Sequence, residues 1–123
     1  MNVGVVGGGI GGVAAGLALE RAGIGAVIYE RAPRLQEVGA GMMLWPNATR
    51  VLKELGVLQR LEAHSGPTTN FLVRSDRGEV LMDIALGRYD VPALCARRAD
   101  LLNALLSVLP PRSIRLGNEL ISF

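Results

Sequence analysis

The sequence has very few of the residues that build disulfide or metal frameworks. Its 123 residues include one cysteine, Cys95, and one histidine, His64. A single cysteine cannot close a disulfide within the chain, and no spacing of Cys and His resembles a metal site. We therefore expect no disulfide framework and no bound metal. A reducing, cytoplasmic location is the default for such a chain.

Charge clusters and long apolar runs are also lacking. The net charge is +2, Lys53 is the single lysine, and the arginines form no basic run. This balance argues against nucleic acid or an anionic membrane as a partner. No apolar run approaches the roughly 20 residues that span a bilayer. The apolar N-terminus has no positively charged start of a signal peptide and is rich in glycine.

Glycine and hydrophobic residues are abundant instead: 16 glycines, and a hydrophobic content of 50%. This length suits one domain with a packed core. Residues 2–6 form an apolar run typical of a buried strand, and residues 7–12 read Gly-Gly-Gly-Ile-Gly-Gly. Residues 13–21 have helical spacing, and residues 25–30 read as a second strand. The opening therefore predicts a strand, a glycine turn, a helix and a strand.

Three of these glycines match the pattern G-x-G-x-x-G of dinucleotide-binding proteins. Gly7 permits a sharp turn, Gly9 leaves room for a pyrophosphate beside the backbone, and Gly12 lets the helix lie close to the sheet. The start of the helix would face the phosphates. Glu30, about 20 residues further on, could accept hydrogen bonds from ribose hydroxyls. A glycine-rich turn without a ligand is the alternative, but the flanking elements favour dinucleotide binding.

The rest of the chain predicts further short elements. Gly23 is expected to end the first helix. Asn47 is expected to cap a second helix and Gly56 to end it, whereas residues 31–46 carry two prolines and two glycines and exclude a long regular element. A turn at residues 75–78 predicts a β-hairpin. The expected helices cover residues 47–55, 58–63 and 100–109, and the expected strands cover residues 68–74, 79–84, 114–116 and 119–123.

Three stretches together resemble a known family. They are residues 5–12 with Glu30-Arg31, residues 39–48 (Gly-Ala-Gly-Met-Met-Leu-Trp-Pro-Asn-Ala) followed by a helix and Leu55-Gly56, and residues 98–101 (Arg-Ala-Asp-Leu). Along its whole length the chain resembles the flavin-dependent aromatic hydroxylases, which are single-component FAD monooxygenases of the salicylate and p-hydroxybenzoate hydroxylase type.

The resemblance implies a set of FAD-binding residues. The glycines would hold the pyrophosphate, Glu30 the adenosine ribose, and Arg31 would lie on the adenine side. Met43 would lie where the Gly-Ala-Gly loop passes the flavin. Arg98 would reach the cofactor from outside the sheet, and Leu120 would lie in a strand near the adenine. The full set is Gly7, Gly9, Gly11, Gly12, Glu30, Arg31, Met43, Arg98 and Leu120.

Several residues have simpler interpretations. Arg98 could form a surface ion pair instead, and Arg97, which replaces a histidine of many relatives, is expected to be a solvated neighbour. Trp45 is expected to serve packing, Cys95 to be buried and inert, and His64 to lie on the surface. We identify no catalytic side chain.

The fold class implied is α/β: a parallel, Rossmann-like FAD-binding sheet with the beginning of an antiparallel substrate-domain sheet, truncated. Residues 1–66 and 96–123 would form the dinucleotide-binding core, with residues 114–116 as its third strand. Residues 67–95 would be a hairpin of the substrate-domain sheet. Family members are several times longer and carry Asp-Gly and Gly-Asp motifs, which this sequence lacks. We therefore expect this chain to be the N-terminal part of such an enzyme. Alone it would be inactive and able to self-associate through an unfinished sheet edge.

The activity implied for the whole enzyme is hydroxylation of a small aromatic substrate with O₂ and NAD(P)H, with FAD as cofactor. Two alternatives stay open. One is a stand-alone, non-catalytic nucleotide-binding module. The other is part of an NAD(P)-dependent dehydrogenase, which shares the glycine pattern and Glu30 but leaves residues 39–48 and 98–101 without an explanation.

Overall fold

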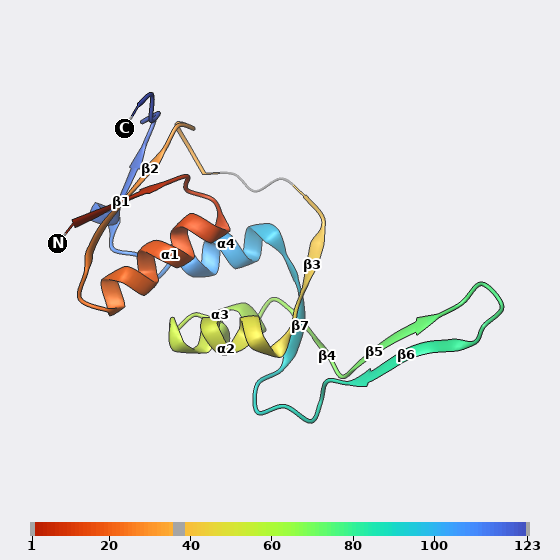
Figure 1. Cartoon of the computed structure of the whole chain (residues 1–123). Helices are drawn as coiled ribbons and strands as arrows, with labels where there is room; N and C mark the ends of the chain where they lie inside the picture. Colours follow the sequence, from red (N-terminus) through yellow and green to blue (C-terminus); the bar gives the residue numbers. More distant parts are fainter. Residues whose placement is uncertain (1, 36–38, 123) are drawn as a thin grey trace.

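The computed structural model describes residues 2–35 and 39–122. Figure 1 shows an α/β body with a long hairpin extending from it. In chain order the elements are β1 (Asn2–Val6), α1 (Ile10–Arg21), β2 (Gly25–Glu30), β3 (Gly41–Leu44), α2 (Pro46–Glu54), α3 (Leu58–Glu62), β4 (Gly66–Thr68), β5 (Asn70–Arg74), β6 (Val80–Ala85), β7 (Ala93–Arg97), α4 (Arg98–Leu106), the 3₁₀ helix η1 (Pro111–Ser113) and β8 (Ile114–Leu116).

A parallel sheet in the order β1-β2-β8 forms the first layer. β2 lies in the centre, so that Val5 of β1 and Ile114 of β8 both pair with Ile28. The side chain of Ile28 is fully buried, as is typical of a central parallel strand. The three strands expected for the dinucleotide-binding sheet are therefore confirmed, together with their parallel direction.

Helices α1 and α4 pack together beside this sheet (Figure 1). α1 approaches β2 closely because Gly16 carries no side chain: a Cβ atom there would lie 2.7 Å from Cδ1 of Ile28. Leu17 of α1 and Leu105 of α4 are buried in the same core, which continues under α2 and α3 through Leu52 and Leu61. One hydrophobic core thus joins the sheet to all four α-helices.

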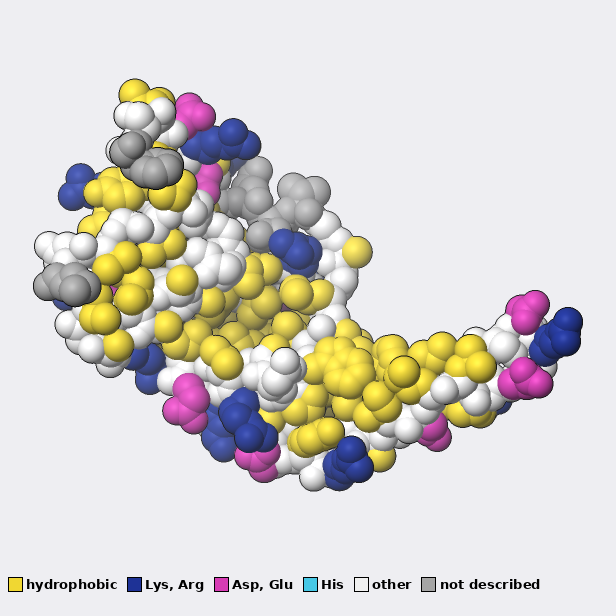
Figure 2. All heavy atoms as spheres, in the orientation of Figure 1, with side chains coloured by type: hydrophobic (Ala, Val, Ile, Leu, Met, Phe, Trp, Pro, Cys, Tyr) yellow, Lys and Arg dark blue, Asp and Glu magenta, His cyan; other side chains and the backbone are white. Residues whose placement is uncertain are grey.

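Antiparallel pairing dominates the middle of the chain. β7 lies between β3 and β4 in a second sheet, and β5 pairs with β6 in a hairpin. The hairpin leads away from the body (Figure 1). Hydrophobic side chains gather in the hollow beside it and continue along it (Figure 2). Exposed apolar side chains of the hairpin include Leu72, Val80, Leu81 and Met82.

The structure corrects several expectations for individual elements. The strand at residues 93–97 was not predicted, because its sequence lacks β-branched residues and it becomes a strand through pairing on both edges. α2 begins at Pro46 with Trp45 as N-cap, so the expected cap at Asn47 is wrong; proline is preorganised for the first helical position. α4 begins at Arg98 rather than at residue 100.

The strand expected at residues 119–123 is also wrong for residues 119–122, and Phe123 lies outside the described residues. Residues 119–122 adopt no strand, because the described part of the chain provides no neighbouring strand for them to pair with. Leu120, which was expected within that strand, therefore lies in an irregular segment and is 50% exposed.

Two helices end at glycines in the left-handed region. Gly23 after α1 has φ +74°, and Gly56 after α2 has φ +72°. The N–H of Ile24 donates to the carbonyl of Leu19, and the N–H of Val57 donates to that of Leu52, as in a Schellman motif. The predicted stops at both glycines are confirmed. In the described ranges, no helix is long and apolar enough to cross a membrane.

The tight contact between α1 and β2 generates a stability prediction. Gly16→Val should lower the free energy of unfolding by about 1–3 kcal/mol, because the new side chain must displace the buried Ile28. Gly11→Val is the matched control in the same helix, since a Cβ there meets no atom within 4 Å. Urea denaturation measures both. Equal effects of the two substitutions would contradict this account of the packing.

Candidate functional site

The glycine turn between β1 and α1 is held by backbone contacts. The N–H of Gly7 donates to the carbonyl of Tyr29 (2.8 Å), and Gly7 has φ +99°, a region that disfavours any side chain. A Cβ atom on Gly12 would lie 1.9 Å from the carbonyl oxygen of Gly7. The first turn of α1 therefore rests on the glycine turn itself, and position 12 accepts glycine alone.

The start of α1 is open to an anion. Gly9 is the N-cap, no side chain caps the helix, and the first turn contains no acidic residue. The first N–H groups of a helix have no partner within the helix, and the helix dipole adds partial positive charge at that end. A helix of 12 residues that starts in this way can hold a phosphate group.

Glu30, at the end of β2, faces this turn. Its Oε2 accepts a hydrogen bond from the N–H of Gly8 (2.6 Å), and its Oε1 accepts one from the N–H of Ala32 (2.8 Å). These N–H groups, Ala32 first, lower the pKa of the Glu30 carboxyl from its ordinary value of 4.5. The positive charge of Arg31 contributes in the same direction, and burial opposes it. Glu30 is therefore a carboxylate that already holds two backbone amides.

Gly8 was not expected to be a site residue. It occupies a variable position of the glycine pattern, yet it is buried. A Cβ atom there would lie 2.8 Å from Cδ2 of Leu35 and 3.0 Å from Cβ of Glu30. A side chain at position 8 would therefore push Leu35 and Glu30 out of their present positions. The run of three glycines at residues 7–9 was the available signal.

A depression of about 300 Å³ lies at the carboxyl end of the parallel sheet. It brings together four of the expected site residues: Gly7, Glu30, Arg31 and Leu120. The chain near Leu120 reaches this place because the N–H of Asn118 donates to the carbonyl of Glu30 (2.9 Å). The complete lining is Val6, Gly7, Tyr29, Glu30, Arg31, Asn118, Glu119 and Leu120.

Met43 and Arg98 lie elsewhere, around β3 and β7. Met43 pairs with Cys95 across the second sheet and lines an open depression of about 510 Å³, whose lining also includes His64 and Arg97. The first residue of α4 is Arg98, and its Cδ would be 3.4 Å from a Cβ on Gly39. Arg98 thus packs beside the Gly-Ala-Gly loop. The two depressions share no lining residue.

Side chains with simpler interpretations are placed as follows. Trp45 packs on Phe71, with ring centroids 5.1 Å apart, which supports its packing role. His64 is exposed, as expected. Cys95 is exposed, so its expected burial is wrong: it lies on the outer face of β7, and its Sγ is 3.3 Å from Oγ1 of Thr68.

Arg97 is exposed, as expected, but it also forms an ion pair. Its Nε and one terminal nitrogen lie 2.7 and 3.0 Å from the carboxylate of Asp100. Hydrogen bonding to this arginine lowers the pKa of Asp100. The pair joins the N-cap of α4 to its first turn.

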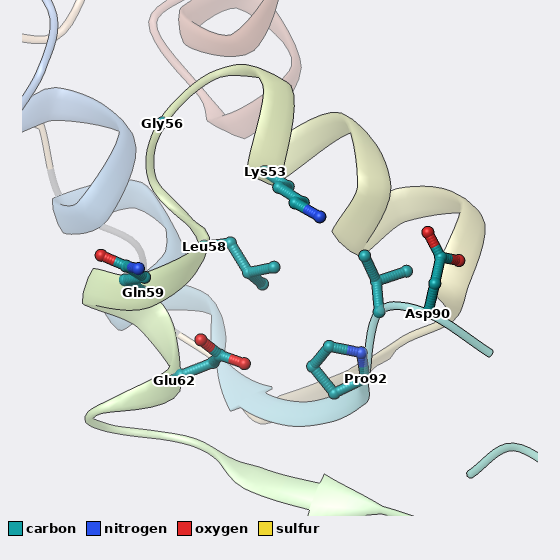
Figure 3. A pocket seen from close by; sticks show the side chains of 8 residues that line it. Lys53, Gly56, Leu58, Gln59, Glu62, Asp90 and Pro92 are labelled. Atoms are coloured by element: carbon teal, nitrogen blue, oxygen red, sulfur yellow. The ribbon is translucent and has the colours of Figure 1, made fainter. Parts of the chain in front are cut away.

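A further pocket, of about 320 Å³, contains none of the expected site residues. Figure 3 shows the side chains of Lys53 and Leu58 extending from α2 and α3, with Pro92 on the opposite side. Asp90 at its rim forms an ion pair with Arg50. The pocket therefore belongs to the packing of α2 and α3 against residues 90–92.

The comparisons with known proteins agree on one family. A family model described as "FAD binding domain" matches residues 1–111. The 3-amino-4-hydroxybenzoate 2-monooxygenase PtmB3 of Streptomyces platensis is 37% identical over 93% of this chain and 30% of its own length. The 6-hydroxynicotinate 3-monooxygenase of Pseudomonas fluorescens is 33% identical over 97% of this chain and 32% of its own length.

A solved structure shows the same arrangement. Klebsiella pneumoniae HpxO, crystallised with FAD and uric acid, superposes with a TM-score of 0.74 at 28% identity, over 95% of this chain and 31% of that protein. The chain thus spans about 30% of the length of the relatives it matches.

The hydrogen bonds of Glu30 generate a pH prediction. Since its pKa is lower in the folded chain, its contribution to stability is present above about pH 4.5 and is lost as the pH falls through the folded-state value. We expect the unfolding free energies of the unchanged chain and of Glu30→Gln to differ by a constant amount at neutral pH and to converge in acid. Denaturant titrations at a series of pH values measure this difference. A difference that stays unchanged as the pH falls far below 4.5, the ordinary pKa of the carboxyl, would contradict it.

Proposed function

This chain belongs to the FAD binding domain family of FAD-dependent monooxygenases, whose cofactor is FAD, and we propose that its glycine turn holds the FAD pyrophosphate. The observation that carries this proposal is the uncapped start of α1 beside Gly7 and Gly9. Gly11 is exposed on the first turn, where no atom would lie within 4 Å of an added Cβ. Gly12 lets the first N–H groups of α1 lie close to the glycine turn.

The adenosine half of FAD would occupy the depression at the end of the sheet. Glu30 would accept from the ribose hydroxyls. Each carboxylate oxygen has two acceptor sites, so the bonds to Gly8 and Ala32 leave capacity for the ligand. Arg31 and Leu120, on the rim of the same depression, would border the adenine.

The flavin half would lie toward β3 and β7. Met43 is half-buried on β3 and would lie where the Gly-Ala-Gly loop passes the flavin ring. Arg98 opens α4 beside Gly39 and would reach the cofactor from that side. The family resemblance supports both roles, together with the position of these residues beside the Gly-Ala-Gly loop.

For the whole protein we propose hydroxylation of a small aromatic substrate with O₂ and NAD(P)H. The names of the relatives support it: they describe monooxygenases of 3-amino-4-hydroxybenzoate and of 6-hydroxynicotinate. Bound FAD supplies the redox and oxygen chemistry, and the residues of this chain bind and orient it. A nicotinamide-dependent dehydrogenase is not favoured, because these relatives are FAD enzymes or monooxygenases.

The middle of the chain would serve the substrate domain. We propose that residues 67–95 belong to its antiparallel sheet and that residues 1–66 and 96–123 form the FAD-binding core. The exposed apolar residues of the β5-β6 hairpin support this division, since such a surface normally meets another part of a protein. The open edges of the sheets would also permit self-association of the isolated chain. We also propose a cytoplasmic location, because a chain with a single cysteine suits a reducing compartment.

The pyrophosphate site is tested at Gly9. Gly9→Val should abolish retention of FAD, because the valine side chain would occupy the space of the phosphates. The fold should survive, because the φ of −72° at this position is one that valine can adopt. Flavin absorbance of the purified protein and a titration with FAD measure this. Gly66→Val is a control at a position where a Cβ meets no atom. Retention of FAD by Gly9→Val would move the phosphates elsewhere.

The proposal that this chain binds FAD but does not complete the reaction alone is tested with the 123 residues by themselves. We expect them to yield no hydroxylated product with FAD, NADPH and a panel of hydroxybenzoates, because the depression beside Met43 is open to water and the chemistry needs a closed pocket. Product analysis by chromatography and sedimentation of the chain provide the readouts. Coupled hydroxylation by a monomer would show that the chain needs no further domain.

A further inference from the structure

We infer that Glu30 is also a positioning residue for the phosphate site: its carboxylate orders the glycine turn before any ligand binds. The inference rests on the proposed function, since the turn is taken to be the pyrophosphate site. The ribose contact alone does not require a carboxylate that holds a backbone amide of the turn. In this structure Oε2 of Glu30 accepts from the N–H of Gly8 at 2.6 Å.

The second oxygen of Glu30 determines where the first one lies. Oε1 accepts from the N–H of Ala32 at 2.8 Å, only two residues further along the chain. The carboxylate is therefore anchored to its own strand end on one side and reaches across to the glycine turn on the other. Both hydrogen bonds have a charged acceptor, the stronger class in proteins.

The fit around Gly8 supports the same role. Gly8 is buried, and a Cβ there would collide with Leu35 and with Cβ of Glu30. A glycine at this position thus lets the carboxylate approach the amide. The next residue, Gly9, is the N-cap of α1, so the position of Gly8 determines where the first N–H groups of α1 point.

For a ligand without ribose hydroxyls, a charge role and a positioning role of Glu30 predict opposite changes in affinity when Glu30 is removed. If Glu30 acted only through its charge, its removal would strengthen diphosphate binding, because a negative group near an anion would be lost. If Glu30 orders the turn, its removal weakens the same binding, because binding must then order the turn. Ordering the backbone of one residue corresponds to roughly a fivefold to thirtyfold loss of affinity.

The experiment compares ADP with 2′,3′-dideoxy-ADP, which keeps the adenine and the diphosphate but lacks both hydroxyls. Calorimetric titration of the chain and of Glu30→Gln should show weaker binding of both ligands to the variant, with the dideoxy ligand losing at least about fivefold. Glu30→Asp keeps the charge but shortens the reach, and it should show the same loss. Glu119→Gln, which removes a carboxylate from the same depression, is the matched charge control and should not weaken the dideoxy ligand. Unchanged or tighter binding of the dideoxy ligand to Glu30→Gln would overturn the inference.

A measurement without ligand separates this inference from the proposed function. Amide hydrogen exchange followed by NMR should show Gly8 protected in the unchanged chain and exchanging faster in Glu30→Gln, with the core of α1 unaffected in both. Equal exchange of Gly8 in the two proteins would overturn the inference. If the unchanged chain binds neither nucleotide, the proposed function fails, and the exchange of Gly8 still decides whether Glu30 orders the turn. Gly8→Ala provides a second route to the same loss, because its Cβ displaces Glu30.

Discussion

The close approach of the glycine turn to the first turn of α1 is the constraint on which the rest of the site depends. A Cβ on Gly12 would lie 1.9 Å from the carbonyl oxygen of Gly7. No change of side-chain rotamer can relieve this clash, because the backbone alone fixes the positions of both atoms. This contact brings the start of α1 over the end of β1, and Gly16 then lets the same helix settle on Ile28. Helix, turn and central strand are therefore positioned by the absence of side chains.

The electrostatics of the site follow from that geometry. The uncapped start of α1 carries partial positive charge, and the carboxylate of Glu30 approaches the same turn from the neighbouring strand. The carboxylate and the positive end of the helix thus lie on the two sides of the turn, and the start of α1 stays open to an anion. If Glu30 both orders the turn and accepts from the ribose, these two roles explain why a negative residue lies so near the proposed phosphate site.

The remaining elements extend the core and carry Met43 and Arg98, the residues proposed for the flavin half of the site. β7 is central to this arrangement, because it pairs with β3 and β4 and runs directly into α4. It therefore connects Met43 on one neighbouring strand with Arg98 at the start of the helix. The hairpin β5-β6 leaves this sheet (Figure 1) and exposes apolar side chains.

Local pattern was enough to predict the opening unit, the third parallel strand, the hairpin and the family. The glycine spacing and Glu30 carry their own geometry, and the stops at Gly23 and Gly56 follow from one residue each. Tertiary structure alone decided what depends on partners. Residues 93–97 became a strand through two neighbours, residues 119–122 did not become one without a partner, and Cys95 faces solvent because of the face of β7 on which it lies. The role of Gly8 was hidden for the same reason, since only the folded chain brings Leu35 and Glu30 against it.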